Sequence, residues 1–455
     1  MRALVGRLLA IELFTLRGYR VTSSDALAFA AGLLAAVLVS PSGTPGVHLA
    51  DNALLTITMI TREALRVLRN NLTFTKRVSR LYDSKFGVEG AKIGTVLNVR
   101  KPPRYVVREG AALQPQDATE TQVPVTLDTQ AHVDITFSST DLALSIDDFS
   151  NRFLKPAIAA IANRIDKKGL ELYKTIANSV GTPGVTPADL DVYLSAGVKL
   201  DDESTPLDGQ RSVVVTPQMQ ATLVNALKGL FQQSSAIASQ YMKGQMGTAA
   251  GFDFYMDQNV AMHTVGPLGG TPLANGAQDN TSSLVTNGWT SSAANRLKRG
   301  DVITIANVNA VNPQSRESTG ALRQFVVLAD ADSDGSGNLT ASIYPAIVSS
   351  GANQTVDAAV VSGAAILTFG QVSSTQNDQS RTGLAFHPDA FTLVTADLPL
   401  PKSVDMAARV ADEDLGISIR AIRDYSIDSD TWPCRLDVLF GWATLRPELA
   451  CRIQG

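Results

Sequence analysis

Residues 154–184 decide the fold, and their sequence is LKPAIAAIANRIDKKGLELYKTIANSVGTPG. Apolar side chains recur at helical spacing through most of this stretch, within the longest helical pattern of the chain, residues 148–180. Pro156 is tolerated only in a first turn, so we expect the regular helix to begin near Leu154 or Lys155. The glycines and proline of residues 181–184 end the pattern. The stretch therefore predicts one long helix that serves as a strut.

Upstream of the helix, residues 94–137 have the pattern of β-strands. Candidate strands at 95–99 and 123–127 flank a hydrophilic middle, and residues 132–137 (HVDITF) alternate with period two. Two long strands around a polar tongue predict an extended β-hairpin that projects from the body. Because such a hairpin has no core of its own, it must bury its faces against another surface. We expect that surface to belong to another subunit.

Residues 57–83 precede the hairpin and predict an amphipathic helix, because Ile60, Ala64, Leu68 and Leu72 fall at steps of four. Its other faces carry six basic residues: Arg62, Arg66, Arg69, Lys76, Arg77 and Arg80. One interpretation is an arm that lies on a neighbouring subunit or faces nucleic acid. The other is an ordinary solvated helix face.

The remainder of the chain contains an apparent insertion. Residues 185–260 are mixed α/β, with a buried-type strand at 211–215, a cap and helix start at Thr216 and Pro217, and another strand from 251. Residues 264–380 are rich in Gly, Ser, Thr and Asn, and hold candidate strands at 301–305, 324–328, 339–344 and 365–369. Strand-rich sequence resumes after residue 381, at 390–395, 417–422 and 436–444. This order predicts a small β-barrel or sandwich inserted into an α/β domain.

Composition narrows the class of protein. At 455 residues the chain is long enough for two or three domains. Cys434 and Cys451 are too few to staple so large a chain, and they indicate reduced thiols. The formal net charge is −4, and no basic stripe is visible along the sequence. A protein that reads nucleic acid normally needs one, so the charge favours a container over a sequence-specific binder.

Residues 1–50 differ from the rest, with four arginines before an uncharged run from Ala26 to Val39. Those fourteen residues would span about 21 Å as a helix, short of the roughly 30 Å hydrocarbon core, so we expect no membrane span. The basic-then-apolar order suits an export signal, whereas Glu12, Asp25 and the lack of a small-residue cleavage site do not. The other interpretations are an added arm or a start codon assigned upstream of the true one.

No recognisable catalytic motif stands in the sequence. The four histidines lack metal-ligand spacing, and there is no nucleophile elbow, P-loop or dinucleotide fingerprint, so we assign no catalytic or cofactor-binding residue. One candidate metal site is Asp330, Asp332 and Asp334, which match the first half of a calcium loop. Its twelfth position is Ala341 instead of Glu, and the same residues between two strands also suit a hairpin loop.

The order of these parts resembles the gene-five coat protein family of P-22-like short-tailed bacteriophages, over residues 55–455. The landmarks, in family order, are TPQ (216–218), AGFD (250–253), LKRGDVITI (297–305) with VNAVNP (308–313) and RQFVV (323–327), and LRPE (445–448). The resemblance implies an α+β fold of the Hong-Kong-97 capsid type. Its implied parts are an N-terminal extension (1–50), an arm (51–93), an extended β-hairpin loop (94–137), a spine helix with the first part of the peripheral and axial domains (138–263), an inserted β-barrel domain (264–380) and the return segment (381–455).

The same resemblance implies a non-enzymatic function without cofactors: a major capsid protein of a tailed bacteriophage. Such subunits form hexamers and pentamers and assemble with a scaffolding protein and a portal protein into an icosahedral procapsid. The shell expands as double-stranded DNA is packaged. The implied location is the virion capsid, assembled in the cytoplasm of the bacterial host. Two departures are expected: a shortened family insertion loop between Thr264 and Arg296, and the 1–50 extension, which has no counterpart.

Within that scheme the loop from Lys101 to Glu120 carries charges of both signs, which suits a contact formed in register with a neighbour. We predict intersubunit contacts at Arg104, Arg108 and Glu109; the alternative is a solvated loop without a partner. Expansion of a shell requires hinges, and the candidates are Gly90, Gly94 and Gly110.

Two other classes remain open from the sequence. The 1–50 stretch and the Ser/Thr/Asn-rich β-segment also suit a secreted or surface-layer structural protein. An enzyme with an unrecognised site in the α/β portion is the third class.

Overall fold

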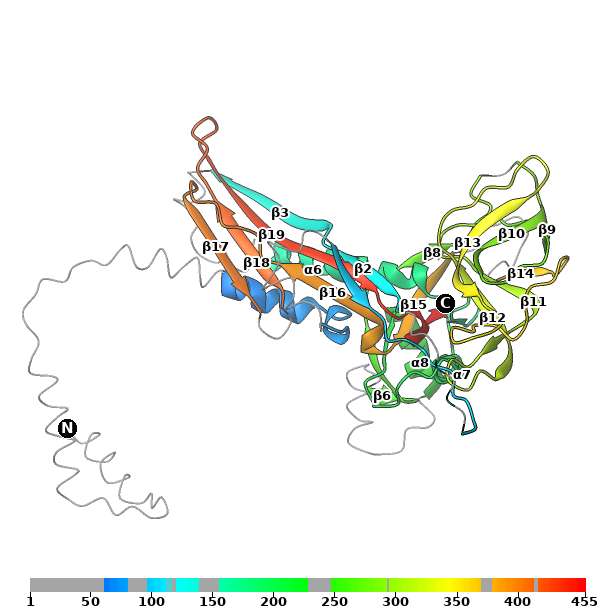
Figure 1. Cartoon of the computed structure of the whole chain (residues 1–455). Helices are drawn as coiled ribbons and strands as arrows, with labels where there is room; N and C mark the ends of the chain where they lie inside the picture. The colour runs from blue at the N-terminus through cyan, green and yellow to red at the C-terminus, as the bar shows by residue number, and fades with distance from the viewer. Residues whose placement is uncertain are drawn as a thin grey trace, which may run out of the picture. The chain divides into compact units, whose positions relative to one another are not determined.

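The computed structural model describes residues 61–80, 96–111, 113, 115, 120–138, 155–227, 247–292, 294–369, 379–412 and 416–455 (Figure 1). The expectations for residues 1–50 and for the hinge candidates Gly90 and Gly94 lie outside these residues.

The predicted strut is helix α6, Lys155–Leu170, and the residues just before Lys155 lie outside the described part of the chain. The helix ends before the predicted boundary at residue 180, because a 3-10 helix, η4 (Glu171–Thr175), and a short strand, β4 (Ser179–Val180), follow. Apolar residues in η4 still face the core, so their spacing did not reveal where the α-helix stops. At this end a Cβ on Gly169 would lie 2.8 Å from the Phe74 ring, which shows how closely the arm approaches α6.

Within the described residues the arm helix covers 61–71, and the 3-10 helix η2 (Thr75–Arg77) follows it. The helix therefore ends before the predicted boundary at residue 83, whereas the predicted start at residue 57 lies outside the described residues. Ala64, Leu68 and Leu72 are buried, as their spacing predicted. The helix ends early because the carboxylate of Asp166 on α6 accepts hydrogen bonds from the backbone N–H groups of Thr73 and Thr75, which holds that segment in a turn.

An antiparallel sheet lies against both helices. Its order is β16 (Phe391–Ala396), β19 (Thr431–Thr444), β18 (Ser418–Arg423) and β17 (Met406–Ala411), and β3 (Thr129–Ser138) pairs with β19 along ten residues. One face of the sheet packs on the arm helix and α6 in a single apolar cluster, to which β19 contributes Leu436, Val438 and Phe440. Figure 1 shows β3, β17, β18 and β19 running side by side as long strands.

The β-hairpin predicted for residues 94–137 is present only in part. Strands β1 (Val96–Arg100) and β2 (Gln122–Thr126) pair antiparallel around a long loop, whereas residues 129–138 join the five-stranded sheet as β3. The hairpin also buries one face within its own subunit, since Val99 and Val125 pack on Val394, Ala443 and Leu445. The expectation that this face is covered only by another subunit was therefore wrong for the root of the hairpin.

A second sheet has the order β4–β20–β15–β5–β7–β6, with β8 pairing to β15. Its strands are β20 (Ala450–Gln454), β15 (Gln379–Phe386), β5 (Ser212–Val215), β7 (Phe252–Met256), β6 (Thr248–Ala249) and β8 (Met262–Thr264). Helices α7 (Asp191–Asp202) and α8 (Pro217–Leu227) pack on it. The Thr216 hydroxyl accepts the Met219 N–H, so the predicted cap of α8 is confirmed. Short 3-10 helices, η5 (Pro388–Ala390) and η6 (Pro447–Leu449), lead into β16 and β20.

The inserted domain is connected to the rest of the subunit through two paired strands. In the β8–β15 pair, Thr264 lies opposite Gln379 and His263 opposite Ser380, so the chain leaves and re-enters the second sheet at one place. Between them six strands form a sheet in the order β14–β11–β12–β13–β10–β9, around a separate apolar core. They are β9 (Gly270–Ala274), β10 (Thr281–Trp289), β11 (Val302–Val311), β12 (Ser318–Val327), β13 (Leu339–Ile347) and β14 (Ile366–Phe369). A bridge between Leu273 and Ala365 nearly closes the barrel. The predicted α+β class with an inserted all-β barrel is confirmed.

Candidate functional site

The loop between β1 and β2 is the candidate contact surface, and its root is fixed within the subunit. The Lys101 N–H donates to the Thr121 carbonyl at 2.8 Å, which extends the strand pair by one step. Burial lowers the pKa of Lys101, and the Glu448 carboxylate opposes that effect. The loop therefore begins as an ordered continuation of the hairpin.

Arg104 forms an ion pair within its own subunit. Its Nη2 lies 3.5 Å from Oε1 of Glu448, and Oε2 of the same carboxylate accepts the Tyr344 hydroxyl at 3.1 Å. Burial raises the pKa of Tyr344 well above its ordinary value, so this hydroxyl stays protonated and able to donate. Arg104 thus connects the loop to the C-terminal segment and, through Glu448, to β13 of the inserted domain.

Tyr105 contacts the inserted domain directly through its backbone carbonyl. Nη2 of Arg316 donates to the backbone carbonyl of Tyr105 at 2.9 Å and to that of Ala352 at 3.2 Å. A planar guanidinium with several donors suits such a shared contact. Residues 101–105 are thereby held from two sides.

Beyond that anchored root the loop is exposed. Arg108, Glu109 and Gly110 are all exposed, as expected for contact candidates. Gly110 has φ +121° with no atom within 4 Å of a Cβ built on it, so a side chain would find space but not an allowed backbone conformation. This geometry is compatible with the hinge prediction for Gly110.

Sequence reasoning missed the apolar part of the loop. Val107 and Leu113 each expose 91% of their surface, and Tyr105 exposes 55%. The sequence does contain these three large apolar residues, but the loop from Lys101 to Glu120 was described only by its charged residues. Large apolar side chains that are exposed on a loop with a fixed root are typical of residues that insert into a binding partner.

The three aspartates of the candidate calcium loop accept hydrogen bonds from backbone N–H groups. Oδ1 of Asp334 accepts the N–H groups of Ser336 and Asn338, each at 2.8 Å, while Asp330 and Asp332 accept N–H groups of Arg299 and Asn295. These bonds support the hairpin-loop interpretation. In the described ranges no cluster of three or more His, Cys, Asp or Glu side chains is placed to hold a metal ion.

A buried polar network joins the inserted domain to the body. The Tyr173 hydroxyl meets Nδ1 of His263 at 3.0 Å, and Nε2 of His263 meets Oδ1 of Asp301 at 2.9 Å. Arg452, fully buried, donates from Nε to the Ile176 carbonyl and from Nη1 to the Gly300 carbonyl, at 2.8 and 2.6 Å. Burial raises the pKa of Tyr173 to about 12 and lowers that of Arg452 to about 10.

The network could not be found from the sequence, because its members come from four separate segments. These segments are η4, β8, the turn just before β11, and β20, and they meet where the insertion leaves the body. Nη2 of Arg452 is the member of the network that has no hydrogen-bond partner among the described residues. Networks of this kind fix a unique packing, since each unpaired member would be costly.

Two further properties limit the chemistry of the described residues. Cys434 and Cys451 are free thiols, and burial raises the pKa of Cys451 to about 12, so it stays an unreactive thiol. Among the residues that the structure covers, no helix has both the length and the apolar character to cross a bilayer.

Comparison with known proteins gives one decisive match. A family model described as "P22 coat protein - gene protein 5" matches residues 49–455. No curated protein matches the sequence. Among solved structures the chain is similar to one of Mycobacterium phage Che8, with 14% identity and a TM-score of 0.42 over 84% of this chain and 90% of that one. It is also similar to the capsid of cyanophage P-SCSP1u, with 11% identity and a TM-score of 0.40 over 79% and 83%. The CUS-3 coat protein I-domain matches 22% of this chain and 96% of its own, with 22% identity and a TM-score of 0.17.

The family match over most of the chain defines the class of the protein: a structural subunit of a virion capsid, and not an enzyme. More particularly, the chain belongs to the P22 coat protein family and is a major capsid protein of a tailed phage. The resemblance found in the sequence is confirmed, and the surface-layer and enzyme interpretations are set aside. Residues 1–48 lie outside the matched range.

Proposed function

We propose that this subunit forms the hexamers and pentamers of an icosahedral procapsid, together with a scaffolding protein and a portal protein. The shell then expands while it encloses double-stranded DNA. In this process the β1–β2 loop makes a contact between subunits, in which Arg104, Arg108 and Glu109 take part. Gly90, Gly94 and Gly110 are the proposed hinges.

The observation that carries the loop assignment is the contrast between its root and its tip. Arg104 and the Tyr105 carbonyl are bonded within the subunit, whereas Val107 and Leu113 are almost wholly exposed. Burying one such side chain contributes about 1.5–3 kcal/mol, and a closed shell repeats the contact in every subunit. The apolar tip therefore provides most of the affinity, and the charged residues set the register.

The test is assembly of a double variant, Val107→Asp with Leu113→Asp, on purified coat protein mixed with its scaffolding protein. Both positions are exposed in the subunit, so the free energy of unfolding of the unassembled protein, from urea unfolding, should stay within about 0.5 kcal/mol of the parent value. We expect at least a tenfold loss of shells by sedimentation and electron microscopy. The matched control is Leu207→Asp with Val361→Asp, two apolar residues exposed elsewhere. Equal yields from the loop variant and the parent protein would overturn the assignment.

A further inference from the structure

The β1–β2 loop is tied to the inserted domain at Tyr105, beyond the end of the paired strands. Strand β1 ends at Arg100, so the ladder no longer fixes the path of the chain at this residue. The Tyr105 carbonyl accepts a hydrogen bond from Nη2 of Arg316 at 2.9 Å, and the same nitrogen donates to the Ala352 carbonyl at 3.2 Å. One guanidinium of the inserted domain therefore holds the loop two residues before the exposed Val107.

Arg316 lies on a turn that is itself fixed to the body of the subunit. The turn joins β11 to β12, and the Arg316 N–H donates to the Asn312 carbonyl across it at 2.9 Å. The side chain of Asn312 donates to the Asp202 carbonyl at the end of α7 at 2.9 Å. It also accepts the Ser204 hydroxyl at 3.1 Å. The guanidinium of Arg316 is therefore carried by a turn whose position is set from two sides.

The backbone and the bonding of Arg316 indicate that its side chain has a role at this position. Its φ is +62°, in the left-handed region, which is unfavourable for a residue with a Cβ. Strained conformations of this kind are concentrated at functional positions. Both hydrogen bonds of Nη2 go to backbone carbonyls from separate segments, whereas Arg323 of the same domain pairs with the Glu203 carboxylate. A guanidinium that donates to carbonyls restrains the path of the chain.

The neighbouring ion pair is the weaker restraint on the loop. Arg104 and Glu448 approach to 3.5 Å, but 35% of the Arg104 side chain is exposed. Ion pairs that water can reach contribute little, because solvent screens the charges and two long side chains must be ordered. The Arg316 contact acts on the backbone itself, so it decides where the loop runs.

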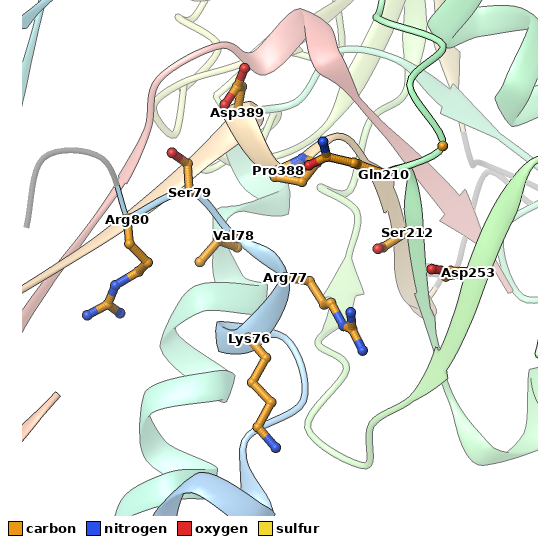
Figure 2. A pocket seen from close by; sticks show the side chains of 11 residues that line it. Lys76, Arg77, Val78, Ser79, Arg80, Gln210, Ser212, Asp253, Pro388 and Asp389 are labelled. Atoms are coloured by element: carbon orange, nitrogen blue, oxygen red, sulfur yellow. The ribbon is translucent and has the colours of Figure 1, made fainter. Parts of the chain in front are cut away.

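The contact between the loop and the inserted domain is separate from the cavities of the described chain. A cavity of about 560 Å³ at the end of the arm has Lys76 and Asp253 among its lining residues (Figure 2). Another, of about 400 Å³, lies within the inserted domain beside Leu273. Neither lining includes Tyr105 or Arg316. The contact therefore acts on the position of the loop and does not form the wall of a pocket.

We propose that the inserted domain positions the β1–β2 loop for its contact with a neighbouring subunit, with Arg316 as the positioning residue. Two residues span at most about 7 Å, so a fixed backbone at Tyr105 keeps Val107 within that distance of the inserted domain. Each residue that a partner would otherwise have to order weakens the affinity by about tenfold. The inference rests on the proposed function of the loop, and it gives the inserted domain a part in the contact between subunits.

The first test measures how freely the loop moves in the full-length unassembled protein. Arg316→Met keeps the apolar stem and the Cβ but removes every donor, and the matched control is Arg299→Met, at an exposed arginine of the same domain. Because a protease cuts an anchored loop only when it opens, trypsin should cleave after the exposed Arg108 about tenfold faster in Arg316→Met. Arg299→Met should be cleaved like the parent, and Arg316→Lys, which keeps a donor, should restore much of the protection. Parent-like cleavage of Arg316→Met would overturn the proposal.

The second test measures shell formation by the same variants mixed with the scaffolding protein. Arg316→Met should need about tenfold more protein than the parent for half-maximal assembly, since only the fraction with a correctly placed loop can bind. It should cause no further loss in the Val107→Asp, Leu113→Asp background, because it acts through the loop tip. A lowered urea midpoint with normal assembly would show that Arg316 only stabilises its own domain, and would refute the positioning role. If Val107→Asp with Leu113→Asp assembles like the parent, the loop contact of the proposed function fails instead, and the positioning role fails with it.

Discussion

Asp166 connects the arm to the strut, and its replacement has a predictable dependence on pH. One carboxylate oxygen accepts the Thr73 N–H at 2.6 Å, and the other accepts the Thr75 N–H at 3.1 Å and the Thr75 hydroxyl at 2.5 Å. Burial raises the pKa of Asp166 to about 6 against these hydrogen bonds, and the nearby Asp257 carboxyl raises it further. The native protein therefore holds a proton at Asp166 at pH values where an exposed aspartate has lost it.

The sign of the effect follows from where that proton is bound. In the unfolded chain the carboxyl has its ordinary pKa of 3.8, so between about pH 4 and pH 6 the native state binds the proton and the unfolded state does not. The free energy of unfolding must then fall as the pH rises through this window. A shift of two pKa units corresponds to roughly 3 kcal/mol. Above about pH 6 the contribution is constant.

Asp166→Asn removes the titration but keeps the shape of the side chain. We expect the parent protein to lose about 3 kcal/mol relative to this variant as the pH is raised from 4 to 7, measured by urea unfolding of the unassembled protein at each pH. Asp428→Asn, at an exposed loop carboxyl, is the control and should follow the parent at every pH. A constant difference between parent and Asp166→Asn, or one that grows in favour of the parent with pH, would refute the reasoning.

Three more substitutions test the packing. Arg452→Met leaves two buried carbonyls without a donor where the insertion meets the body, and should lower the free energy of unfolding by about 3–5 kcal/mol, read from urea unfolding. Gly441→Ala would place a Cβ 1.8 Å from the Thr126 carbonyl oxygen, so we expect a loss of about 1–3 kcal/mol or more; a parent-like urea midpoint would contradict the close crossing of β2 over β19. Thr216→Ala removes the cap of α8 and should cost about 1 kcal/mol, whereas Thr216→Ser should restore the stability.

Local patterns predicted individual elements well. The Thr216 cap and the strands at 211–215 and 301–305 follow from the order of neighbouring residues, and the structure has them. The end of the strut was placed too late, because a 3-10 helix keeps apolar residues on the core side just as an α-helix does. The end of the arm helix was also placed too late, since the group that ends it, Asp166, lies more than ninety residues away.

The candidate site was predicted less well than the fold. Arg104 lies against Glu448 of its own subunit, 344 positions along the chain, and its contact with a neighbour stays a prediction. Arg108 and Glu109 lie on the exposed part of the loop as expected, and their contact with a neighbour stays a prediction. The apolar tip was overlooked because charge dominated the composition of the loop, whereas exposure decides which of its residues a partner can reach.

Periodicity, turn residues and the order of segments were enough to indicate an α+β chain with an inserted β-domain and its resemblance to a coat protein family, because each of these is a property of neighbouring residues. Strand pairing and contacts between distant side chains are not properties of neighbouring residues. Only the tertiary structure decided that β3 pairs with β19, that Tyr173, His263 and Arg452 meet, and that Arg104 lies against Glu448. The physical reason is that pairing and side-chain contacts depend on distances in space, and residues far apart in a chain become close only when the core has formed.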